Sequence, residues 1–369
     1  MTAGVLSPDL SSPHAHTQVQ KMKRVSTLLI LLAVVAAVAV AIDIPEDKIR
    51  AEFARFRETH KRFYSSPLEA EARYQLFRAN YIEAMEINAR TGVQSHGVTR
   101  FMDWSLEEKK AFLGYKRDFK ARSQSRHQVM PRPDQVSAAP DTFDWRSTAV
   151  TPVRDQGRCG SCWAYSATEQ VESAMLLKYK NGTVPSSWLS TQQTVDCDTY
   201  DYGCNGGDTI TAYRYMMSVN GIASEKAYPY QAVDGSCKYS PWMATVKVTD
   251  WSWVIPPCNT GSGDCSKQDE AGMAAIMKEK GPASICVMVS NDWFSYTGPA
   301  PYHGTCTNNY YDLNHCVQVV GIGEDKTSGP YWIVRNSWGT SWGDQGYIYL
   351  PYGSNTCGVA SEVTMVTVA

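Results

Sequence analysis

Cysteine is absent from the first 158 residues of this 369-residue chain, and all 11 cysteines lie between Cys159 and Cys357. Histidine is also scarce, with seven in total. Apart from Cys159 and Cys162, no two cysteines have the Cys-x₂-Cys spacing, so a four-cysteine zinc site is not expected. The sequence suggests no metal and no other cofactor.

Excess charge of one sign is missing as well, since the formal net charge is −2 and no long basic run occurs. This balance argues against nucleic acid as a partner. Residues 42–138 carry 18 Lys and Arg against 14 Asp and Glu, whereas residues 139–369 carry 14 against 22. The two parts should attract each other near neutral pH, and protonation of carboxylates in acid should weaken that attraction.

The longest unbroken apolar run, Leu28–Ile42, has only 15 residues. It follows the basic stretch 21–24 and ends with small residues at Ala39 and Ala41, a pattern typical of a secretory signal peptide. A membrane anchor is the alternative, but the run is short for a bilayer core of ~30 Å. We therefore expect entry into the secretory pathway, and then a lysosome, an acidic vacuole or the extracellular space. Either Met1 or Met22 can be the start.

The most informative stretch is Gln156–Trp163, read as Gln-Gly-Arg-Cys-Gly-Ser-Cys-Trp. Apolar residues at helical spacing predict a helix over 161–180. A thiol in its first turn, at Cys162, would be favoured as thiolate by the helix dipole. Cys-Gly-Ser-Cys-Trp at 159–163 matches the nucleophile signature of papain and the cathepsins, so the chain resembles the papain-like cysteine proteases.

That resemblance implies a histidine and an asparagine downstream of the nucleophile. His315 precedes an apolar strand-like run and Asn336 ends another, 153 and 174 residues after Cys162. These intervals exceed the family's spacing of about 130–150 residues, and an insertion at 254–267 explains the excess. A buried structural histidine is the alternative for His315, but its register with both other residues favours catalysis.

The family's chemistry implies the role of each residue. Cys162 attacks the peptide carbonyl, His315 exchanges protons and Asn336 orients the imidazole. Gln156 and the backbone N–H of Cys162 would stabilise the oxyanion. Trp338 would shield the His315–Asn336 bond from water.

The same resemblance predicts the residues of the substrate cleft. The pocket for P2, the second substrate residue before the cleaved bond, would have Glu362 at its bottom and Asp208 as a second acid. It should accept apolar residues and Arg, although both carboxylates can instead point to solvent. The insertion at 254–267 contains no histidine for an occluding loop, so we expect an endopeptidase. The remaining cleft residues implied are Gly206, Gly207, Cys286 and Cys316.

Cysteine pairing follows from the resemblance in part. It implies three disulfides, Cys159–Cys204, Cys197–Cys237 and Cys306–Cys357. Cys258 and Cys265 both lie in the insertion, where a local bridge is the simplest hypothesis. Cys286 and Cys316 are either bonded to each other or are two small buried thiols. Asn181 begins an Asn-Gly-Thr glycosylation sequon.

The chain should comprise an N-terminal extension and signal peptide at 1–41, an inhibitory propeptide at 42–138 and a peptidase domain at 139–369. Residues 42–138 resemble the cathepsin L-type prosegment, and residues 116–138 read as an exposed linker. The fold expected is the two-lobed α+β papain fold, with a helical lobe and a β-barrel-like lobe, preceded by a mainly helical prodomain. The prosegment motif is carried by Glu69, Arg73, Phe77, Asn80 and Asn88, and by Gly97, Thr99, Phe101 and Asp103.

Together these features predict a cysteine endopeptidase, a monomeric zymogen that acts on peptides and proteins and is inhibited by its own propeptide. No stable membrane anchor is expected. The alternatives are a non-catalytic binding protein of the same fold and a protease that keeps residues 28–42 as an anchor.

Overall fold

The structure, a computed structural model, describes residues 42–118, 128–134, 136–137, 140–179, 188–259 and 261–369. The expected signal peptide and Asn181 lie outside these residues. Within them, no helix is both long enough and apolar enough to cross a membrane. The account below concerns the compact unit that begins at Ile44 and ends at Ala369.

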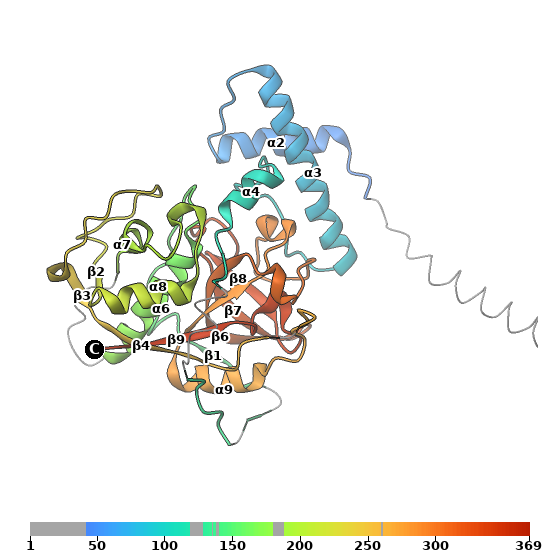
Figure 1. Cartoon of the computed structure of the whole chain (residues 1–369). Helices are drawn as coiled ribbons and strands as arrows, with labels where there is room; N and C mark the ends of the chain where they lie inside the picture. Colours follow the sequence, from blue (N-terminus) through green and yellow to red (C-terminus); the bar gives the residue numbers. More distant parts are fainter. Residues whose placement is uncertain (1–41, 119–127, 135, 138–139, 180–187, 260) are drawn as a thin grey trace, which may run out of the picture. The chain divides into compact units, whose positions relative to one another are not determined.

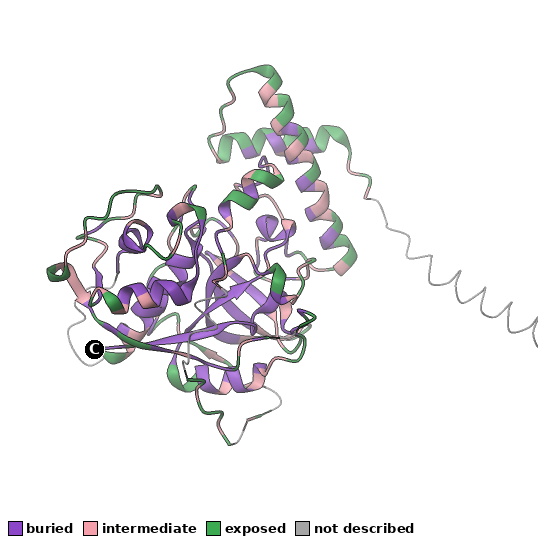
Figure 2. Cartoon of the chain, viewed as in Figure 1, coloured by how far each residue is buried: buried purple, intermediate pink, exposed green. Residues whose placement is uncertain are grey.

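Three helices come first in the described part of the chain, and two of them cross each other (Figure 1). Aromatic side chains fill the space between the first two helices, with Phe53 and Phe77 ring centroids 5.2 Å apart. Their outer faces are exposed (Figure 2). This is the mainly helical prodomain that the sequence predicts. The helices are α2 (Glu46–Thr59), α3 (Pro67–Thr91) and α4 (Leu106–Phe112).

Helix starts follow local side-chain chemistry. Ser66 caps α3, because its hydroxyl accepts the Glu69 N–H at 3.1 Å, but the Glu69 carboxylate accepts from Ser65 rather than from the cap residue. The reciprocal capping box lies instead at Ser105 and Glu108, at the start of α4. Such boxes satisfy two backbone donors that a helix leaves unpaired.

The helical lobe is built around α6, which the sequence predicts correctly. Nearly every residue of α6 is buried, because the helix packs on α8 and on β6 and β9 of the sheet. Two short strands that pair with each other also belong to this lobe (Figure 1). The elements are α6 (Cys162–Lys178), α7 (Thr191–Cys197), α8 (Thr209–Ser218), β2 (Ile222–Ala223) and β3 (Ala244–Val246), with 3₁₀ turns at Gly203–Asn205 and Pro241–Met243.

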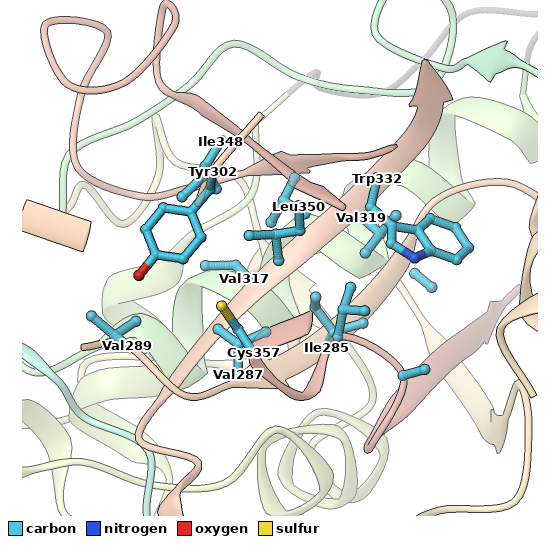
Figure 3. Packing of buried hydrophobic residues seen from close by; sticks show 14 of the residues in the cluster. Ile285, Val287, Val289, Tyr302, Val317, Val319, Trp332, Ile348, Leu350 and Cys357 are labelled. Carbon is cyan, nitrogen blue, oxygen red and sulfur yellow. The ribbon is translucent and has the colours of Figure 1, made fainter. Parts of the chain in front are cut away.

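The second lobe is an antiparallel sheet with strand order β4-β9-β5-β6-β7-β8, and β1 pairs with β6. One face carries alternating apolar side chains, among them Ile285, Val317 and Leu350 (Figure 3). The two strand-like runs expected after His315 and before Asn336 are both present as strands. The elements are β1 (Phe143–Asp144), β4 (Val248–Trp253), α9 (Glu270–Lys280), β5 (Ala283–Val287), β6 (His315–Asp325), β7 (Gly329–Arg335), β8 (Tyr347–Pro351) and β9 (Val363–Val368), with 3₁₀ turns at Asn291–Ser295, Tyr310–Asp312 and Thr356–Gly358.

Candidate active site

Cys162 is the first residue of α6 and is fully buried. Its sulfur accepts the backbone N–H of Gly114, from the propeptide, at 3.3 Å. Burial raises the pKa of Cys162 to about 11, and nearby backbone N–H groups, including that of Trp163, only partly offset this. The sulfur is therefore a neutral thiol in this state, although it sits at the positive end of a helix.

His315 begins β6, and Asn336 directly follows β7. The His315 Nε2 lies 2.9 Å from the Asn336 Oδ1, and that oxygen also accepts the Ser337 N–H at 2.8 Å. Because the Asn336 oxygen can only accept hydrogen bonds, the His315 Nε2 must carry the proton, and Nδ1 is left as the basic nitrogen. The ring lies against Trp338, with the two ring centroids 5.1 Å apart. Burial lowers the pKa of His315 to about 4, so the imidazole is neutral here.

Both the oxygen and the nitrogen of the Gln156 side-chain amide form hydrogen bonds. Its Oε1 accepts the Ser337 hydroxyl at 2.7 Å, and its Nε2 donates to the carbonyl oxygens of Cys159, at 2.8 Å, and Phe112, at 2.9 Å. The Phe112 carbonyl belongs to the propeptide, so a peptide carbonyl of the chain itself already faces this amide. The position suits a donor to a carbonyl oxygen that gains negative charge.

Tyr230, which the sequence analysis did not single out, links two parts of this site. Its hydroxyl donates to the Gln156 carbonyl at 2.8 Å and lies 2.6 Å from the Ser161 hydroxyl. Since the single phenolic proton goes to a carbonyl, Ser161 must donate to the phenol oxygen. The contact fixes the residue just before Cys162 against the loop that carries Gln156.

The propeptide crosses the site as an extended strand. Gly207 donates to the Gly114 carbonyl at 2.9 Å and accepts the Lys116 N–H at 2.8 Å, while Tyr115 donates to the Asn314 carbonyl at 3.0 Å. A Cβ on Gly114 would lie only 1.8 Å from the carbonyl oxygen of residue 160, so only glycine fits there. Gly207 thus pairs with extended backbone, whereas the Gly206 N–H and carbonyl bond to Gly203 and Tyr202.

The neighbouring pocket holds two propeptide side chains at one carboxylate. Glu362 is buried, and its Oε1 accepts from Arg117 Nε at 2.9 Å while its Oε2 accepts from the Tyr115 hydroxyl at 2.5 Å. The Tyr115 ring packs against the Cys286–Cys316 disulfide and Leu313. Glu362 therefore points inward rather than to solvent. Of the linker expected at 116–138, the Arg117 side chain is only 6% exposed, whereas Lys116 and most of the described residues of 128–137 are exposed.

Asp208 lies beside the same extended propeptide segment but has a different role. Its Oδ1 accepts the Ile210 N–H and caps α8, and its Oδ2 accepts the Asp118 N–H at 3.0 Å. Its backbone N–H donates to Asp201 at 3.0 Å. Both carboxylate oxygens thus already bond to backbone N–H groups. Asp208, which the sequence predicts as a second pocket acid, is thus the N-cap of α8, and aspartate is one of the residues preferred at that position.

Ten cysteines form five disulfides, and Cys162 is the one free cysteine in the described chain. Cys286 and Cys316, left open by the sequence, stand opposite each other on β5 and β6 and are bonded. No cluster of three or more potential metal ligands occurs among the described residues. The five pairs are Cys159–Cys204, Cys197–Cys237, Cys258–Cys265, Cys286–Cys316 and Cys306–Cys357.

Comparison with known protein families gives two matches along the chain. Residues 139–367 match the family described as "Papain family cysteine protease". Residues 53–108 match the "Cathepsin propeptide inhibitor domain (I29)".

Individual relatives span nearly the whole chain. Cathepsin L of Sarcophaga peregrina is 34% identical over 354 residues, which are 93% of this chain and 99% of the relative. Cysteine proteinase 15A of Pisum sativum is 34% identical over 336 residues, or 86% of each chain. Among solved structures, procathepsin L2 proteinase from the larval midgut of Tenebrio molitor has a TM-score of 0.75 at 32% identity, with 86% of this chain and 99% of that chain covered.

Proposed function

The chain belongs to the papain family of cysteine proteases and carries its propeptide inhibitor domain, and from this premise we propose a cysteine endopeptidase that uses Cys162 and His315. The observation that carries this proposal is the propeptide backbone in the cleft. Its Gly114 N–H bonds to the Cys162 sulfur, and the Phe112 carbonyl bonds to the Gln156 amide. A peptide of the chain itself thus occupies the groups that a substrate would use.

The reaction proceeds in two stages. The Cys162 thiolate attacks the scissile carbonyl carbon, and the negative charge that forms on oxygen is stabilised by the Gln156 amide and the Cys162 N–H. His315 then protonates the leaving amine through Nδ1, and an acyl-enzyme remains. In the second stage His315 takes a proton from water, the resulting hydroxide attacks the acyl carbon, and the acid product leaves with regeneration of the thiolate.

Latency follows from the same geometry. Burial is the largest cause of the raised pKa of Cys162 and of the lowered pKa of His315, so neither group carries the charge that the reaction requires. Departure of the propeptide strand rehydrates both groups and allows a thiolate–imidazolium pair to form. The zymogen is inactive both because the cleft is occupied and because its two reactive groups are neutral.

We assign residues 42–138 to the propeptide, residues 139–369 to the peptidase domain and residues 1–41 to the extension with its signal peptide. Five disulfides suit an oxidising compartment, which supports the secretory route to a lysosome, an acidic vacuole or the extracellular space. We assign Asn181 as the glycosylated residue and propose that the enzyme works as a monomer on peptide and protein substrates.

The pocket contents support dual specificity at P2. An aromatic ring, Tyr115, and a guanidinium, Arg117, reach the same Glu362 carboxylate in the zymogen. The walls are apolar and include the Cys286–Cys316 disulfide, so uncharged side chains should bind there as well. We therefore propose that P2 accepts apolar residues and Arg.

The test of the proposal is Cys162→Ala, which removes the nucleophile and leaves the fold. The variant zymogen should stay unprocessed in acid, and the variant domain, freed from its propeptide by an added protease, should not cleave an internal bond of a peptide. Wild-type enzyme should lose activity when an iodoacetamide-type reagent alkylates one thiol. Measurable turnover by Cys162→Ala, or removal of residues only from chain ends by the wild type, contradicts the proposal.

A further inference from the structure

The insertion at residues 254–267, closed by the Cys258–Cys265 disulfide, lies beside the pocket that contains Glu362. Its first anchor is the Cys258 N–H, which donates to the Ser361 carbonyl at 2.8 Å. Ser361 directly precedes Glu362, so this bond joins the insertion to the segment that places the pocket carboxylate.

The second anchor of the insertion is the turn at Tyr310. The Gly263 carbonyl accepts the Tyr310 N–H at 2.8 Å, and Asp264 pairs with Asn309 as an isolated antiparallel bridge. Gly263 has a φ of +78°, and a Cβ there would lie 2.5 Å from the Asn309 Oδ1, so the close approach requires glycine. The insertion therefore fixes the position of Tyr310 as well as that of Glu362.

Between these two residues lies the guanidinium of Arg117. Its Cζ is 3.5 Å from the centroid of the Tyr310 ring, and one terminal nitrogen donates to the Tyr310 carbonyl at 2.7 Å. On another edge, Nε donates to Glu362 at 2.9 Å. Both charged side chains are nearly inaccessible to solvent, and cation–π attraction is stronger when the cation is desolvated.

We propose that Tyr310, held in place by the insertion, is a specificity-determining residue that binds the guanidinium of a substrate arginine against Glu362. The inference rests on the proposed function, because it assigns the occupant of the same P2 pocket. A guanidinium offers a flat face to the ring while its edge donates to the carboxylate and the carbonyl. A lysine ammonium has neither the planar face nor the fork of donors, so the clamp selects Arg over Lys.

The experiment uses the activated enzyme and three fluorogenic peptides that differ only in Arg, Lys or Phe at P2. Tyr310→Leu keeps apolar bulk and removes the ring, so kcat/KM for the Arg peptide should fall roughly tenfold while that for the Phe peptide stays within about twofold. Tyr310→Phe keeps the ring and should retain cleavage of the peptide with Arg at P2. Tyr311→Leu is the matched control, because this neighbouring ring is 56% exposed, and it should leave all three values unchanged.

Equal losses on the Arg and Phe peptides, or an unmoved Arg-to-Phe ratio, would overturn the clamp. If Tyr310→Leu does not fold, the wild-type enzyme still tests the clamp. The clamp requires kcat/KM for the Arg peptide to exceed that for the Lys peptide by about tenfold or more. Failure of the proposed function is distinct, because wild-type enzyme would then cleave none of the three peptides and alkylation of Cys162 would change nothing.

Discussion

The contacts that stabilise the peptidase domain differ from the contacts that attach the propeptide to it. All five disulfides lie in the peptidase domain, around a sheet whose apolar face is buried. The propeptide has no cysteine, and it contacts the domain through a few aromatic rings, short backbone pairings and ion pairs. Three of these propeptide rings, Phe101, Trp104 and Phe112, belong to the same buried cluster as the apolar face of the sheet, so their loss should loosen the propeptide.

The largest of these contacts is aromatic. Phe101 is fully buried, and its ring centroid lies 5.2 Å from that of Phe294 and 5.3 Å from that of Trp338. The Thr99 hydroxyl, two residues earlier, donates to the Phe294 carbonyl. The propeptide thus covers Trp338, the ring that lies against His315.

Phe101→Ala should produce the largest change in latency. Removal of a buried phenylalanine costs about 3–5 kcal/mol, which corresponds to a loss of roughly a hundredfold or more in the docking constant of the propeptide. The full-length variant should show peptidase activity at neutral pH, where the wild-type zymogen shows little. Initial rates on a fluorogenic peptide, taken before chain cleavage appears on a gel, measure the effect. Phe63→Ala is the control, because that ring is 89% exposed and should leave latency intact.

Glu362 tests whether substrate and propeptide use one pocket. Glu362→Gln keeps the volume and removes the charge, so the ratio of kcat/KM for Arg against Phe at P2 should fall about tenfold to a hundredfold, the worth of a charge-assisted bond. Glu324→Gln, on an exposed part of β6, should leave the ratio unchanged. An Arg-to-Phe ratio that is unchanged in Glu362→Gln would rule out this carboxylate as the source of the preference for Arg.

The sequence singles out Cys162, His315 and Asn336 as the expected reactive residues because each lies in a local pattern of its own. The elements expected to carry them are present as α6, β6 and β7, and the His315 Nε2 lies 2.9 Å from the Asn336 Oδ1. The helix that begins at Cys162 followed from apolar periodicity. Disulfide partners inside the insertion were also readable, because only two cysteines lie within it.

Contacts between segments that are far apart in the sequence could not be predicted. Arg117 lies in a polar run typical of a solvated linker, and its partner Glu362 is 245 residues away. Tyr310 and Tyr230 gave no signal, because each acts through a position that only the folded chain supplies. The propeptide contact also contains a buried histidine that net charge does not reveal, and burial lowers its pKa to about 4.

His96 is that histidine. It is 4% exposed, it pairs with Tyr296 across the propeptide contact, and its ring lies 5.6 Å from that of Tyr302. Burial lowers the pKa of His96 to about 4. Of the charged groups around it, Asp292 raises the pKa, whereas His303 and Arg90 lower it further.

The sign of the effect follows from proton linkage. A histidine whose pKa is lower in the docked state favours docking above its ordinary pKa of 6.5, and this stabilisation is lost as pH falls toward 4. Buried carboxylates act in the opposite direction, since burial raises the pKa values of Glu83 and Asp103. The hydrogen bond from Arg132 lowers the pKa of Asp269, so this pair persists to a lower pH than it would with an ordinary aspartate. Of these groups, only His96 is expected to weaken docking as the pH falls from 6.5 toward 4.

His96→Asn keeps a polar side chain beside Ser95 but cannot titrate. The experiment compares two zymogens that both carry Cys162→Ala, one with His96→Asn and one without it. A fixed trace of mature enzyme should process the His96→Asn zymogen about tenfold more slowly than the other near pH 5, and equally fast near pH 7.5. The ratio of the two rates at each pH cancels the pH profile of the added enzyme. His60→Asn is the control, because His60 packs on Phe56 within the propeptide, and its ratio should stay flat. A ratio for His96→Asn that is also independent of pH would show that acid acts on the propeptide through other groups.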